Sequence, residues 1–175
     1  MKKLLLLYSI IIFSSCAFQY AVKNEVDSYT GFNNIYETNN RVQGMTGSVY
    51  LNLSKSSKDG EDIVFIRYDY RDSDWIFMEQ KDGIQLLLSN REVVKLSSLD
   101  FPNRNVESGG SYVGVSESGM IRLDREILKR LLSNPIKTVR VYGKDSFLEY
   151  SMGTNQLQQR WKEFSNTHLG DFLND

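Results

Sequence analysis

The segment IVFIRYDY (residues 63–70) decides the fold class, because its side chains alternate with the two-residue period of a β-strand. One face carries the side chains that we expect to be buried: Val64, Ile66, Tyr68 and Tyr70. The other face carries Phe65, Arg67 and Asp69. Such alternation is typical of an antiparallel sheet with one face packed on the core and the other facing water.

The residues before this strand repeat the same pattern. Val49, Leu51 and Leu53 alternate with polar residues and predict a second strand, and residues 32–38 predict an earlier one. We expect residues 55–60 to form a loop that ends in Asp59-Gly60, a common hairpin turn sequence. The sequence therefore predicts an antiparallel hairpin with residues 63–70 as its second strand.

The residues after this strand predict a meander. Residues 74–80, 84–88 and 92–96 have strand patterns, and the turn sequences Asp82-Gly83 and Ser89-Asn90 separate them. Residues 102–110 are rich in Asn, Ser and Gly and predict a loop, whereas residues 112–123 predict an extended segment.

Two helices are expected in the C-terminal half. Asp124 is a suitable N-cap for an apolar stripe at helical spacing, and Pro135 would end that helix. Thr154 is expected to cap a last helix, and Gly170 to end it. Strands are also expected at 138–142 and 147–150. The sequence thus predicts an α+β fold, mostly antiparallel β (meander or sandwich-like), in a single domain of residues 31–175.

The N-terminus has the three parts of a secretory signal. Met1-Lys2-Lys3 precedes an apolar run over residues 4–13, which is followed by Ser14-Ser15-Cys16. As a helix, this run would reach about 15 Å, half of a hydrocarbon core of about 30 Å. We therefore predict a signal peptide over residues 1–15 rather than a membrane span.

The small pair before Cys16 resembles the lipobox of bacterial lipoproteins. The resemblance implies that Cys16 carries lipid, that the chain is cut before it, and that residues 16–30 form the lipidated cysteine and a tether. Ala17 stands where an Asp retains some lipoproteins in the inner membrane, so the resemblance favours the outer membrane in a two-membrane cell. The alternative is an ordinary secreted protein with an incidental cysteine.

Charge and composition exclude several classes of function. The chain has 21 Lys and Arg against 22 Asp and Glu, and two of its lysines lie in the expected signal peptide. The remainder is therefore slightly acidic, which disfavours binding to nucleic acid. Cys16 is the sole cysteine, so the domain must fold without a disulfide. No phosphate loop, dinucleotide fingerprint, paired cysteine ligands or haem motif is present, and we predict no cofactor.

A second resemblance covers roughly half of the chain, from Trp75 to Phe164. Its motifs are Asp74-Trp75-Ile76-Phe77, Gly109-Gly110, Val115-Ser116-Glu117-Ser118, residues 124–132, Val139-Arg140-Val141 and residues 156–164. Together they resemble domains of unknown function in bacterial secreted and envelope proteins. The resemblance implies an envelope address, and it brings no catalytic residues.

Two short patterns contain residues that could bind a metal ion or act in catalysis. Asp72-Ser73-Asp74 could offer oxygens to a hard cation, but it lacks the remaining ligands of a calcium loop, and a turn is the simpler interpretation. Ser116 lies between Gly114 and Gly119, as the serine of a nucleophile elbow lies between two glycines, but the spacing is not G-x-S-x-G. His168 is the single histidine and would have to serve as its base, whereas a packing or helix-end role suits it better.

The remaining candidate functional residues are glutamates and tyrosines. Any two of Glu79, Glu117 and Glu149 could form a glycosidase pair if the fold brought them together. Five tyrosines on expected strands could form an exposed binding surface, although a β core that uses aromatic residues is the favoured interpretation: Tyr68, Tyr70, Tyr112, Tyr142 and Tyr150.

These observations favour a non-catalytic, lipid-anchored envelope module that binds or assembles with another envelope protein or a wall polymer. The alternative is a carboxylate-dependent hydrolase that acts on cell-wall glycan or peptide. A carrier of a small apolar ligand is a third possibility, which would require an internal cavity. A deep cleft with two facing acids would favour the enzyme, and a flat aromatic face or an open sheet edge would favour the binding module.

Overall fold

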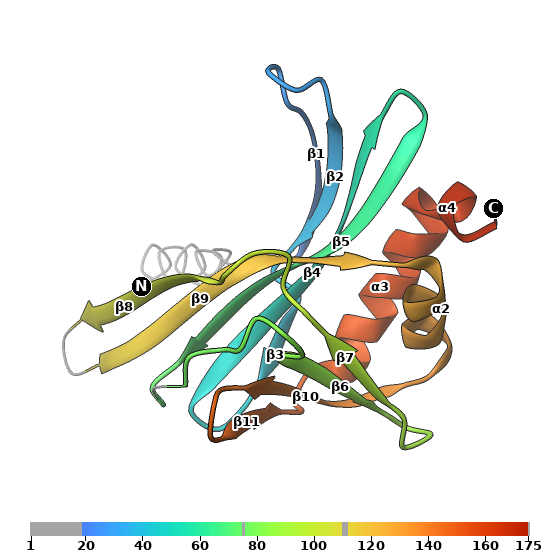
Figure 1. Ribbon diagram of the computed structural model, residues 1–175. Coiled ribbons are helices and arrows are strands. Elements are labelled where there is room, and N and C mark those ends of the chain that lie inside the picture. Colours follow the sequence, from blue (N-terminus) through green and yellow to red (C-terminus); the bar gives the residue numbers. More distant parts are fainter. Residues whose placement is uncertain (1–18, 75, 110–111, 175) are drawn as a thin grey trace, which may run out of the picture.

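A computed structural model describes residues 19–74, 76–109 and 112–174, with side chains described outside residues 107–112. These residues form two antiparallel sheets and three helices (Figure 1). The expected α+β class, mostly antiparallel β with helices in the C-terminal half, is therefore confirmed. None of the helices in these ranges combines the length and the apolarity needed to cross a bilayer.

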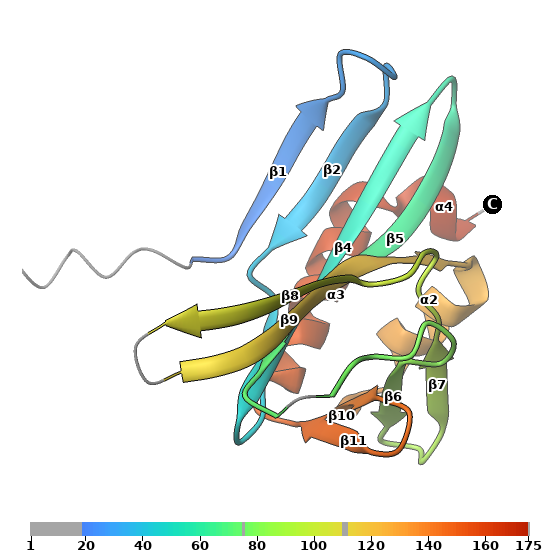
Figure 2. The same cartoon turned by 60° about the vertical axis from the view of Figure 1, so that its left-hand side comes forward.

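The large sheet has the strand order β1-β2-β4-β5-β9-β8, and β3 also pairs with β4. Its strands are β1 (Ala21–Val26), β2 (Asn33–Thr38), β3 (Arg41–Gln43), β4 (Gly47–Lys58), β5 (Glu61–Asp72), β8 (Asn103–Gly109) and β9 (Tyr112–Leu123). The β8–β9 hairpin extends away from the helices in both views (Figures 1 and 2).

The small sheet has the order β11-β10-β6-β7. Its strands are β6 (Ile84–Leu88), β7 (Val93–Leu96), β10 (Ile136–Tyr142) and β11 (Phe147–Tyr150). The helices are α2 (Arg125–Ser133), α3 (Thr154–His168) and the short α4 (Gly170–Asn174). Helix α3 contacts β4 of the large sheet and β10 of the small sheet, so it joins the two sheets through one core.

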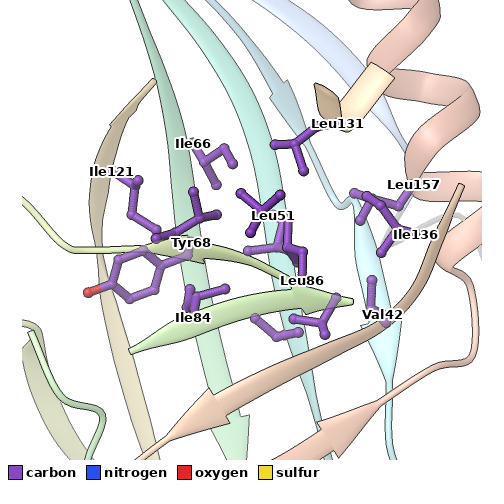
Figure 3. Close-up of a cluster of buried hydrophobic side chains, with 14 of the residues drawn as sticks. Val42, Leu51, Ile66, Tyr68, Ile84, Leu86, Ile121, Leu131, Ile136 and Leu157 are labelled. Atoms are coloured by element: carbon purple, nitrogen blue, oxygen red, sulfur yellow. The ribbon is translucent and has the colours of Figure 1, made fainter. Parts of the chain in front are cut away.

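The core forms where the inner faces of the sheets meet the helices. Figure 3 shows side chains of both sheets and of α2 and α3 gathered in one cluster. Trp161 on α3 is fully buried, and its indole Nε1 donates a hydrogen bond of 3.1 Å to the carbonyl oxygen of Leu51 in β4. That bond gives a carbonyl of the central strand a hydrogen-bond partner, and the ring packs in the core.

The β4–β5 hairpin confirms the expected turn and corrects its length. Asp59 and Gly60 both have positive φ, 53° and 86°, which suits the tight turn predicted from their sequence. The strand continues to Lys58, however, so residues 55–58 are not a loop. Their polar side chains misled the prediction, because backbone pairing with β5 does not require apolar side chains.

Two further segments differ from their predictions. The described residues of 74–80 form no named strand and contribute an isolated bridge between Met78 and Gly143, and β10 takes the place beside β6 that the meander assigned to them. Residues 103–109 form edge strand β8 rather than a loop. Its described side chains, residues 103–106, are exposed, so the sequence carries no apolar alternation there that would predict a strand.

The helix ends are partly as expected. The Asp124 carboxylate accepts a 2.7 Å hydrogen bond from the Ile127 amide, which confirms this cap. Gly153, with φ 95°, precedes α3, and Thr154 donates to the Ser151 carbonyl instead of capping. The helix ends before Leu169, and Gly170 begins α4.

At the other end of the domain, residues 21–26 of the expected tether form β1 and pair with β2.

The Trp161 contact can be tested by mutation. We expect Trp161→Ala to lower the free energy of unfolding by about 3–5 kcal/mol, because it removes a buried ring and leaves the Leu51 carbonyl without its partner. The exposed neighbour Lys162→Ala should change it by about 0.5 kcal/mol or less. Urea unfolding followed by circular dichroism measures both. Similar stabilities for the two variants would contradict this role of Trp161.

Candidate functional site

The strands of the large sheet have two chemically different faces. In β4 the inward side chains Val49, Leu51 and Leu53 are fully buried. The outward side chains from Ser48 to Ser56 are Ser48, Tyr50, Asn52, Ser54 and Ser56, and none of them is charged. We call the side of the large sheet that carries these residues the outer face.

The strand register places residues from distant parts of the chain in rows across the outer face. Arg67 of β5 lies between Asn52 of β4 and Met120 of β9. The next row on one side joins Tyr50 to Asp69 and Ser118, and the row on the other side joins Tyr36 to Ser54 and Phe65. Arg67 is therefore at the centre of this face.

Two hollows of about 510 Å³ each open on the outer face. Both are lined by Tyr36, Arg67 and Met120, so they adjoin. We call the two together the outer groove. One end is lined mainly by polar residues, among them Thr38, Tyr50, Asn52, Asp69 and Ser118. The other end includes the apolar side chains Phe32, Ile63 and Phe65 and the polar side chains Asn34, Ser54 and Ser56.

Arg67 is the exposed cation where the two hollows meet. Its guanidinium carbon lies 4.6 Å from the centroid of the Tyr36 ring, a cation–π contact. No carboxylate of the described side chains lies within 4.0 Å of it. Arg71, in contrast, holds Asp69 through two bonds of 2.9 and 3.0 Å. Arg67 also shares a side-chain hydrogen bond with Tyr36. Its guanidinium has five N–H donors, so donors remain for a ligand.

Tyr36 is held in place by strand β1. Its hydroxyl donates a 2.8 Å hydrogen bond to the Glu25 carboxylate, and this bond raises the pKa of Tyr36. The ring therefore has a fixed partner on one side and the Arg67 guanidinium over its face. Neither Tyr36 nor Tyr50 is among the five tyrosines that the sequence marked as candidates. Alternation alone could have placed Tyr50 outward, since it lies between Val49 and Leu51.

The tyrosines that the sequence did mark are mostly core residues. Tyr68, Tyr70 and Tyr150 are at most 2 % exposed, which confirms the core interpretation for these three. Tyr142 is half-buried and its ring contacts that of Phe147. The Tyr112 side chain lies outside the described part of the chain. The structure therefore does not gather these tyrosines into an exposed binding surface.

Asp72 is used within the fold. Its Oδ2 accepts a 2.6 Å hydrogen bond from the Tyr150 hydroxyl, and its Oδ1 accepts the amide of Asp74. Burial raises the pKa of Tyr150 far above its usual range, so this hydroxyl stays a donor. Residues 72–74 form the end of a strand and a bend, as the turn interpretation predicted. Within the described ranges, no three His, Cys, Asp or Glu residues are placed to hold a metal ion.

The three candidate glutamates have different environments. Glu117 is 1 % exposed, accepts the Met78 amide at 2.9 Å and pairs with Arg104 Nε at 2.8 Å. Burial raises its pKa, and the Met78 amide and Arg104 oppose that shift. Glu79 is exposed outside the named strands, and exposed Glu149 pairs with Arg140 on the small sheet. None of the three lines the outer groove.

Ser116 and His168 belong to opposite sides of the large sheet. Ser116 pairs with Arg71 in the outward register, whereas the inward neighbours in β9 are Val115 and Glu117. His168 ends α3, which covers the inner face, and its ring packs 5.0 Å from that of Phe164. The structure does not bring these two residues together. The packing role predicted for His168 is confirmed.

Glu37 is a buried carboxyl that the sequence analysis missed. It is 1 % exposed and accepts hydrogen bonds from the Leu53 amide at 2.8 Å, from Asn40 at 2.7 Å and from the Tyr20 hydroxyl at 3.1 Å. Burial raises the pKa of Glu37 to about 7. Alternation in residues 33–38 offered a signal, because it places Glu37 on the same face as the apolar Ile35.

Glu37 also fastens the beginning of the described chain. Tyr20 donates to this carboxylate while the Arg160 guanidinium of α3 stacks over the Tyr20 ring at 4.4 Å. The preceding carbonyl of Gln19 accepts a bond from the Asn39 side chain. Cys16 and residues 1–15 lie outside the described residues, so the expected signal peptide and lipidation stay predictions.

Comparisons with known proteins identify no relative of this chain. No protein-family model matches it, and neither the curated proteins nor the solved structures contain a significant match. The two resemblances drawn from its sequence, to lipobox signals and to envelope domains, therefore rest on its own residues.

The pKa of Glu37 predicts a pH dependence of stability. Its folded pKa of about 7 lies above the ordinary value of 4.5, so the folded chain holds a proton that the unfolded chain releases between those values. The contribution of this group to stability is therefore full below pH 4.5 and is lost as the pH rises through 7. The whole difference corresponds to about 3 kcal/mol.

The measurement is chemical unfolding of wild type and Glu37→Gln between about pH 5 and about pH 8. Wild type should gain stability relative to the variant as the pH falls. The exposed Glu126→Gln variant should follow wild type over this range. A constant difference between wild type and Glu37→Gln across the range would show that Glu37 titrates outside it.

Proposed function

We propose that this chain is a lipid-anchored protein of the bacterial envelope and that its domain is a non-catalytic binding module with the outer groove as its ligand site. The observation that carries the proposal is the outer face of β4. Five successive outward positions of a central strand are uncharged, and the face that they belong to is hollowed.

The composition of the groove supports recognition rather than simple solvation. Protein–protein interfaces are enriched in Tyr and Arg and depleted in Lys, Glu and Ser. Binding surfaces rich in Tyr, Ser and Asn combine rigid aromatic area with adaptable hydrogen bonding. The outward side of β4 has this character, and Tyr36 and Arg67 extend it across the neighbouring strands.

The expected anchor would hold the groove close to a membrane. The Gln19 and Tyr20 contacts tie the chain to the domain, and only Ala17 and Phe18 separate Gln19 from Cys16 in the sequence. Three residue steps span at most about 10 Å. A lipidated Cys16 would therefore keep the domain beside the bilayer surface, within reach of envelope proteins and wall polymers.

The proposal can be tested by crosslinking in intact cells followed by recovery of the tagged protein. Tyr50→Lys places a charge among the uncharged outward residues of β4. It should reduce the amount of recovered partner at least about fivefold, which corresponds to a loss of roughly 1 kcal/mol of binding free energy. Val93→Lys introduces the same side chain at an exposed strand position of the small sheet and should leave recovery unchanged.

Cys16→Ala tests the anchor in the same experiment. This variant should leave the membrane fraction and carry no acyl group. Membrane-bound, acylated Cys16→Ala protein would refute the lipoprotein assignment. A folded Tyr50→Lys protein that captures its partner at the wild-type yield would refute the outer groove as the binding site.

A further inference from the structure

The outer groove offers side chains, and not backbone, to a ligand. Strand β4 is paired along its length with β5 and on its other side with β2 and β3, and β5 is paired with β9. Most amides and carbonyls of these strands are therefore paired within the sheet, and the Leu51 carbonyl and the Leu53 amide are bound by the Trp161 and Glu37 side chains. A peptide cannot bind this face by adding a strand, because that mode requires an open sheet edge.

The side chains of the groove suit a ligand that has both hydroxyl groups and apolar ring faces. Hydroxyl and amide groups line both ends, and each can donate as well as accept: Asn34, Thr38, Asn52, Ser54, Ser56 and Ser118. Aromatic rings of Tyr36, Tyr50 and Phe65 lie among them. Sugar rings present this combination, with hydroxyls at their edges and C–H groups on their faces.

The charged residues of the groove indicate which charge its ligand should carry. Asp69 is matched by Arg71, Glu25 accepts the Tyr36 hydroxyl, and the buried Glu37 is held by Leu53, Asn40 and Tyr20. Asp27 accepts the backbone amides of Tyr29 and Thr30, so it is engaged in its own turn. Arg67 is left without an acidic partner among the described side chains, at the point where the two hollows adjoin. A guanidinium in this position is suited to a carboxylate, which it can bind through two hydrogen bonds.

We infer that the outer groove binds a glycan chain that carries carboxylate groups. Arg67 binds the carboxylate, Tyr36 and Tyr50 contact sugar rings, and the serine, threonine and asparagine side chains bind hydroxyl groups. Two adjoining hollows suit an extended chain better than a single small molecule. The inference rests on the proposed function, because it names the ligand of the same site.

Binding of defined glycans to the full chain in detergent solution tests this inference by calorimetry. The first probe is peptide-free glycan strands from a bacterial cell wall, whose repeating unit carries a carboxylate. The second is the same strands after reduction of the carboxylates to alcohols. The third is poly-glutamate, which offers carboxylates on a peptide. We expect wild type to bind the acidic strands best and to bind poly-glutamate at least about tenfold more weakly.

Arg67→Gln should weaken binding of the acidic strands about tenfold, the loss of one charge-assisted contact, and leave binding of the reduced strands unchanged. Arg91→Gln is the matched control, because Arg91 is exposed on the turn before β7 in the small sheet. It should bind both glycans as wild type does. Circular dichroism melting checks that each variant is folded.

Several results would overturn the inference. They are no binding of the acidic strands by wild type, equal loss of acidic and reduced strands in Arg67→Gln, and poly-glutamate binding as tight as that of the acidic strands. The crosslinking experiment separates this failure from failure of the proposed function. If Tyr50→Lys still abolishes capture in cells while no glycan binds, the groove is a binding site for a protein partner.

Discussion

All 12 residues of β4 pair with β5, and this ladder is the constraint on which the rest of the structure depends. Because side chains alternate across a strand, its register decides which residues enter the core and which form the groove. A slip of one residue would turn Leu51 outward and Tyr50 inward. The turn at Asp59 and Gly60, with positive φ at both positions, closes the hairpin in the register that prevents this.

Three buried acids in the described part of the chain are held by hydrogen bonds within the fold. Glu37 accepts the Leu53 amide, Glu117 accepts the Met78 amide, and Asp72 accepts the Tyr150 hydroxyl. Each acid accepts a hydrogen bond from a donor that irregular pairing or burial would otherwise leave unsatisfied. An unsatisfied buried donor costs about 1–3 kcal/mol. The same bonds keep each acid oriented toward its own partner. These three acids support the sheet.

The sequence predicts those features that depend on neighbouring residues. Alternation in residues 63–70, the Asp59-Gly60 turn and the Asp124 cap are all local, and the structure confirms them. Residues 74–80 were assigned to the wrong pairing, because the choice between them and β10 as the neighbour of β6 depends on long-range packing. The groove was missed for a related reason. Tyr36 and Arg67 meet only because β4 aligns β2 with β5.

The core and the groove use different side chains of the same strands, and this separates stability from recognition. Tyr68 is buried beside the exposed Arg67, and Leu51 is buried between Tyr50 and Asn52. Exposed substitutions away from buried networks usually change stability by about 0.5 kcal/mol or less. Within the described side chains, Arg67 contacts the Tyr36 side chain and has no acidic partner to lose. Substitution of Arg67 should therefore affect the groove far more than the core.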